Sequence, residues 1–137
     1  MIKLLVDNDQ DAFDTALTSI VKQGERCMDV NADSLTGSVQ CAYSNDSGQA
    51  CAIGQLVAPS DRGYLTNEPI DQLAYNNKEI NIGDLNLVLL TEIQEAHDRC
   101  GDGKLAMRTY VKLMSVVANK YNLDTKILNK MQEEVYA

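Results

Sequence analysis

The last third of the chain carries three helical patterns in succession, and this feature constrains the fold more than any other. The first pattern, "GDLNLVLLTEIQEAHDRC", has apolar residues on more than one face, which is typical of a central buried helix. The next two patterns each keep a single apolar stripe: Ala106, Tyr110, Leu113, Met114, Val117 and Tyr121, and then Ile127, Leu128, Met131 and Val135. Because the breaks between them are short, we expect antiparallel neighbours. Asp102 is the predicted cap of the second helix, and Asn122 or Asp124 the start of the third.

A further helix is predicted near the N-terminus, between two segments with β character. Residues 1–6 suit a short strand, and Asp7 or Asp9 can cap a helix that ends at Gly24. Over residues 25–47 the helical period is lost, and "RCMDV" and "SVQCAYS" predict a β-hairpin. The fold class is therefore mostly α (α+β): a compact helical domain with a small β-hairpin inserted after the first helix. Residues 1–137 are expected to form a single domain.

The middle of the chain predicts short helices separated by a polar loop. "ACAIGQLV" favours a short helix closed by Pro59, and Pro69 suits the first position of another in "PIDQLAYNN". Between them lies the polar segment "SDRGYLTNE".

The charge balance disfavours nucleic-acid binding. Twelve basic and twenty acidic side chains give a formal charge of −8, and the basic residues are spread singly along the chain. No apolar run is long enough for a membrane span, and "MIKLLV" runs directly into "DNDQD", which does not fit a secretory signal. We expect a cytoplasmic protein without direct contacts to nucleic acid or membrane.

The four cysteines raise the question of a metal site. His97 and Cys100 are three residues apart on one helical face, and Cys41 and Cys51 can supply two thiolates to a tetrahedral zinc ion. The spacing between Cys41 and Cys51 is wider than in a zinc knuckle, so small buried thiols are the favoured interpretation. In that interpretation Gly54 marks a close contact, and His97 bonds to a backbone carbonyl.

A cysteine nucleophile is the second chemical hypothesis. Cys51 is predicted at a helix start, where backbone amides lower a thiol pKa, and His97 can act as the base with Asp98 or Asp84 orienting it. Ile93 lies one turn before His97 on the same stripe, which favours a structural histidine. We therefore assign no catalytic residue and no cofactor, and expect a protein that is not an enzyme.

Two quoted segments, "VQCAYSNDSGQACAIGQLVAPSDRGY" and "LLTEIQEAHDR", resemble an uncharacterised family of small phage and prophage proteins. The elements that match are Cys-x-Tyr, Gly-x-x-Cys-Ala-x-Gly-x-Leu, a Pro-containing segment with a tyrosine, and a His-Asp helix. The resemblance implies a binding protein in the host cytoplasm that acts on a host protein, in host takeover or as an anti-defence inhibitor. Sequestration of a small signalling nucleotide, a zinc-binding structural protein and a Cys51–His97 hydrolase stay open as alternatives, as does a homo-oligomer.

The binding surface is predicted on the central loops, because the later helices use their apolar residues to pack on one another. The residues expected to contact the partner are Asp61, Arg62, Tyr64 and Asn67.

We expect the purified protein to hold no stoichiometric metal, because the ligand spacing is wide and a helical core of this length is stable without one. Elemental analysis measures this directly. About one zinc per chain, with melting on chelation, would contradict it and make Cys41, Cys51, His97 and Cys100 the ligands.

Overall fold

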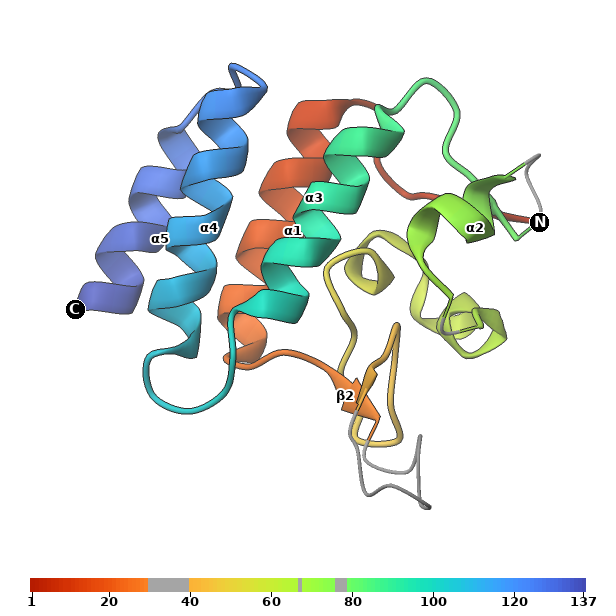
Figure 1. The fold of residues 1–137 in the computed structure, drawn as a ribbon, viewed down its shortest axis with the longest axis horizontal. Coiled ribbons are helices and arrows are strands. Elements are labelled where there is room, and N and C mark those ends of the chain that lie inside the picture. The colour runs from red at the N-terminus through yellow and green to blue at the C-terminus, as the bar shows by residue number, and fades with distance from the viewer. Residues whose placement is uncertain (30–39, 67, 76–78) are drawn as a thin grey trace.

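The computed structural model describes residues 1–29, 40–66, 68–75 and 79–137 (Figure 1). The α-helices are α1 (Asp9–Gln23), α2 (Ile70–Ala74), α3 (Leu87–Arg99), α4 (Ala106–Lys120) and α5 (Lys126–Tyr136), and the 3-10 helices are η1 (Gly54–Leu56) and η2 (Pro59–Tyr64). Strand β2 (Met28–Asp29) pairs antiparallel with β3 (Gln40–Cys41), and β1 (Ile2–Lys3) pairs parallel with β4 (Ile80–Asn81). The mostly helical fold with a small hairpin after the first helix is confirmed.

The helices pack around α1. In Figure 1, α4 and α5 lie side by side at one end of the molecule, α3 crosses in front of α1, and α2 lies at the other end. Helix α1 contacts α3, α4 and α5, and its residues Phe13, Leu17 and Ile20 are fully buried. Tyr110 of α4 is also fully buried, and its hydroxyl donates to the backbone oxygen of Ala16 at 3.2 Å. That bond satisfies the one polar atom of a large core side chain.

The cap of helix α1 lies one residue away from each of the two predicted caps. The side chain of Asn8 accepts a hydrogen bond from the amide of Asp11 at 2.8 Å, so Asn8 is the cap rather than Asp7 or Asp9. Asp9 instead accepts from the amide of Asn86 at 2.9 Å, which ties the start of α1 to the start of α3. The predicted end at Gly24 is confirmed, with φ of 86° and its amide bonded to Ile20.

The predicted caps of the last two helices are also corrected. Helix α4 begins at Ala106, with Leu105 and not Asp102 at the cap position and no side-chain cap; the carboxylate of Asp102 is bonded to Arg26. Helix α5 begins at Lys126, later than either predicted start. The side chain of Asp124 still accepts a hydrogen bond from the amide of Lys126 at 2.8 Å.

The middle of the chain is less helical than predicted. In "ACAIGQLV" only Gly54–Leu56 forms a helical turn, so Cys51 does not lie at a helix start. The segment predicted as a polar loop contains η2, and Arg62 in η2 donates from Nε to the carbonyls of Gly54 at 2.8 Å and Val57 at 3.3 Å. This side chain holds η1 and η2 together.

No helix in the described ranges is both long and apolar enough to cross a bilayer.

Gly54 is the contact point predicted from the sequence. A Cβ atom at this position would lie 2.2 Å from the backbone oxygen of Tyr43, an atom that also accepts from the amide of Cys51 at 3.1 Å. Because this nearest atom belongs to the backbone and cannot swing away as a side chain can, only glycine fits between the end of the hairpin and η1.

The substitution Gly54→Ala is expected to lower the free energy of unfolding by about 2 kcal/mol or more, because the added methyl group forces backbone to move. Urea denaturation measures the change. Gly63→Ala is the matched control, since a Cβ at Gly63 meets no atom within 4 Å. Equal stability of the two variants would contradict this account.

Candidate functional site

His97 joins α3 to the chain that follows α1. The imidazole is fully buried, and its Nε2 accepts a hydrogen bond from the backbone amide of Cys27 at 2.9 Å. An accepting Nε2 places the proton of the neutral ring on Nδ1, which donates to Asp98 Oδ1 at 2.7 Å. The prediction that His97 bonds to a backbone carbonyl is therefore wrong, because the ring accepts from a backbone amide and donates to a carboxylate.

Gln94 shares the face of α3 with this pair, three and four residues earlier. Its Nε2 donates to Asp98 Oδ1 at 2.9 Å, and its Oε1 accepts from the backbone amide of Ile53 at 3.1 Å. Asp98 Oδ1 is thus held by two donors on its own helix, while Gln94 also ties α3 to the turn before η1. The carboxylate is fixed in one orientation.

Arg26 holds the C-terminal end of α3 in the same region. Its Nη1 donates to the backbone oxygen of Asp98 at 2.6 Å, and its Nε and Nη2 bind the carboxylate of Asp102, both at 3.0 Å. The bidentate hydrogen bond from Arg26 lowers the pKa of Asp102 below its ordinary value. The chain after α1 is therefore fastened to the end of α3 and to the connection between α3 and α4.

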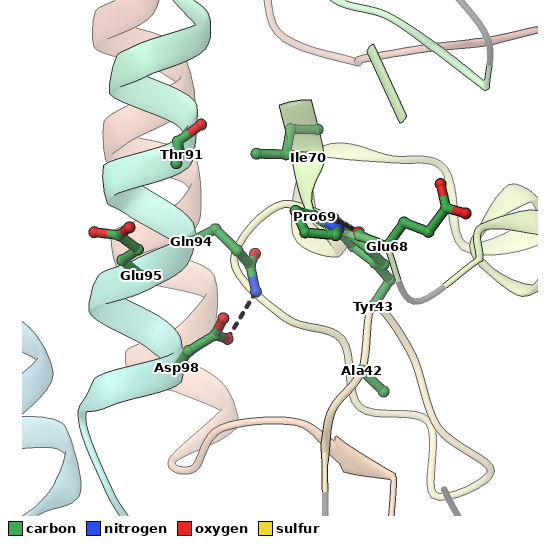
Figure 2. Close-up of a pocket in the computed structure, with 9 residues that line it drawn as sticks. All are labelled: Ala42, Tyr43, Glu68, Pro69, Ile70, Thr91, Gln94, Glu95 and Asp98. Atoms are coloured by element: carbon green, nitrogen blue, oxygen red, sulfur yellow. Dashed lines mark hydrogen bonds between the residues drawn. The ribbon is translucent and has the colours of Figure 1, made fainter. Parts of the chain in front are cut away.

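A cavity of about 220 Å³ lies beside this network. Figure 2 shows Thr91, Gln94 and Asp98 of α3 on one side of it, and Tyr43, Pro69 and Ile70 on the other. The lining is completed by Ala42, Glu68 and Glu95. The cavity thus has an apolar wall facing a polar wall.

The charges around the cavity are negative. Its described lining includes the carboxylates of Glu68, Glu95 and Asp98 and no basic side chain. In Figure 2 the carboxylate of Glu95 points away from Pro69 and Ile70, whereas Asp98 lies at the lower end of the cavity beside Gln94. No described residue donates to the second oxygen of Asp98, and the Asp98 side chain is 39% exposed. Asp98 can therefore receive a cationic group from outside.

Three members of the alternative zinc set, Cys51, His97 and Cys100, are not placed to share a metal ion. Cys51 and Cys100 are buried, and Cys100 Sγ donates to the backbone oxygen of Gly101 at 3.5 Å. Both nitrogens of His97 already have hydrogen-bond partners. Within the described ranges no group of three or more His, Cys, Asp or Glu side chains is placed to hold a metal ion, and the side chain of Cys41 lies outside them.

Cys51 does not have the environment of a nucleophile. The side chain has no exposed surface, and burial raises the pKa of its thiol well above the ordinary value. The expectation of a lowered pKa fails because this burial outweighs the hydrogen bond that Sγ accepts from the amide of Gly54 at 3.2 Å. Cys51 also precedes a 3-10 turn instead of opening a helix. The pair offers neither a thiolate nor a free imidazole nitrogen for a hydrolase mechanism.

Three of the four predicted binding residues lie on η2, outside the cavity. Tyr64 is 78% exposed, Asp61 and Arg62 are half-buried, and Asn67 lies outside the described residues. Their role in binding stays a prediction. Among the described residues of the segment "SDRGYLTNE", Glu68 at its end lines the cavity, together with the following Pro69.

Reasoning from the sequence missed Gln94 as a member of the site. The available signal was its spacing from His97 and Asp98, which places all three side chains on one face of a helix. The contributions of Cys27 and Ile53 are backbone amides, for which residue identity gives no signal.

A comparison with protein-family models, curated proteins and solved structures found no match for this chain.

We expect Cys51 to resist iodoacetamide in the native protein over a time in which urea-unfolded protein is fully modified, because the thiol is buried and protonated. Peptide mapping by mass spectrometry measures the modified fraction. Rapid modification of Cys51 in the folded protein would reveal a reactive thiolate and contradict this.

Proposed function

We propose that this chain is a non-enzymatic binding protein of the phage type that its motifs resemble, and that it acts by capturing a host protein. The interaction takes a basic side chain of that partner into the cavity beside Asp98. The single observation that carries the proposal is an anionic cavity without a basic residue in its described lining.

The two walls of the cavity suit the two parts of a lysine or arginine side chain. Its aliphatic stem can lie along Pro69, Ile70 and the ring of Tyr43, while its charged end meets the open oxygen of Asp98. Because Gln94 and His97 already fix the carboxylate, binding costs little ordering of Asp98.

The overall charge supports the same kind of partner. A formal charge of −8 attracts a basic surface at long range, and this attraction weakens as salt screens it. Exposed Tyr64 on η2 is a candidate for a further contact, because aromatic side chains are enriched at interfaces.

The substitution Asp98→Asn keeps the size of the side chain and an acceptor for Gln94 and His97, but removes the charge. Immobilised wild type and variant are incubated with lysate of a bacterial host, and bound proteins are quantified by mass spectrometry at low and high salt. We expect recovery of the specific partner to fall by at least about tenfold with Asp98→Asn.

Asp46→Asn is the matched control, since it makes the same charge change at an exposed position in the turn between Ser44 and Ala50. It is expected to leave recovery unchanged. Equal recovery by all three proteins, or an equal loss in both variants, would contradict a role for the cavity.

A further inference from the structure

We infer that a second hollow, formed by α1, η1 and η2, binds the phosphate group of a small molecule. The hollow has a volume of about 440 Å³, within the usual range for small-molecule sites. It is lined by Ser19, Lys22, Gln23, Gly48, Gln55 and Arg62. This inference does not depend on the partner proposed for the Asp98 cavity.

The sign of the charge distinguishes this hollow. Lys22 and Arg62 are its ionisable lining residues, so both charges are positive. Three other hollows in the described part of the chain are each lined by more carboxylates than basic groups. The protein as a whole has a formal charge of −8, which repels anions. The two cations of this hollow, with no carboxylate in its described lining, create a local site that attracts them.

Arg62 is already oriented for this role. Its Nε donates hydrogen bonds to the carbonyls of Gly54 and Val57, and these bonds fix the plane of the guanidinium group. No described residue accepts a hydrogen bond from its two terminal nitrogens. A fixed guanidinium with free N–H groups matches the oxygens of a phosphate, and exposed Lys22 adds a second cation.

The remaining polar groups form a rigid floor. Gln55 Nε2 donates to Gln23 Oε1 and to the backbone oxygen of Ala50, both at 3.0 Å, and Gln23 Oε1 also accepts from the amide of Ala50 at 3.0 Å. Gly48 leaves one edge open, since a Cβ there would meet no atom within 4 Å. The hollow can therefore admit a ligand without rearrangement of its floor.

The nature of the ligand follows from this lining. The last turn of α1 carries partial negative charge, which works against an anion, so a ligand needs both cations at once. A phosphate group with several oxygens meets that need better than a carboxylate. The phosphate can belong to a nucleotide or be free inorganic phosphate, and the polar floor has room for the body of a nucleotide.

The test titrates the full isotope-labelled chain with ATP, AMP and inorganic phosphate at constant ionic strength. Nuclear magnetic resonance then follows the amides of Lys22, Gly48 and Gln55 and the Nε of Arg62. We expect saturable shifts at these four positions. Tighter binding of the nucleotides than of phosphate identifies a nucleotide ligand, whereas equal affinities identify free phosphate.

The variant Lys22→Gln is expected to weaken binding by about tenfold, the value of one hydrogen bond to a charged group. Lys112→Gln on α4 makes the same charge change at another exposed lysine and should leave affinity within about twofold. Absence of shifts at millimolar ATP, or equal weakening by both variants, would overturn the inference. Neither result bears on partner capture through Asp98.

Discussion

The hydrogen bond from the amide of Cys27 to His97 is the contact on which much of this structure depends. It connects the chain just after α1 to the last turn of α3, seventy positions later, and it does so inside the core, where water cannot replace either partner. Because Nε2 must accept, the ring proton is placed on Nδ1 and directed at Asp98. One buried bond therefore sets the tautomer of His97, the orientation of Asp98 and the position at which the hairpin leaves α1.

The sequence predicted the four long helices, α1, α3, α4 and α5, but not the hydrogen bonds and strand pairs that join distant parts of the chain. The helix that ends at Gly24, the hairpin and the order of the C-terminal helices follow from local patterns, which is why these could be read directly. The parallel pairing of Ile2 with Ile80 could not be predicted, because strands of two residues are too short to show a period. Asp102 illustrates a different failure: it has good capping chemistry, but α4 begins only at Ala106, and the carboxylate of Asp102 binds the distant Arg26.

The candidate site was likewise predicted only in part. Cys51, Gly54 and His97 were recognised as a place of close approach, and Gly54 does lie against the hairpin. The chemistry expected there was wrong in detail, since a thiol pKa depends on whether a helix begins at Cys51 and on how deeply it is buried. Neither condition can be read from residue spacing. The cavity beside Asp98 also depends on Pro69 and Ile70, which the sequence places far from α3.

The irregular segment from residue 50 to residue 57 links the acidic cavity to the basic hollow. Buried backbone outside regular structure leaves amide and carbonyl groups that need partners, and here long polar side chains provide them. On the cavity side, Gln94 accepts a hydrogen bond from the amide of Ile53. On the other side, Gln23 accepts one from the amide of Ala50. Arg62 donates a hydrogen bond to the carbonyl of Gly54. Side chains from α1, α3 and η2 thus converge on one buried turn. Gln94 also holds Asp98, whose second carboxylate oxygen has no donor among the described residues, and Arg62 keeps its terminal N–H groups without a described acceptor. These two groups, on opposite sides of the turn, are those assigned to binding.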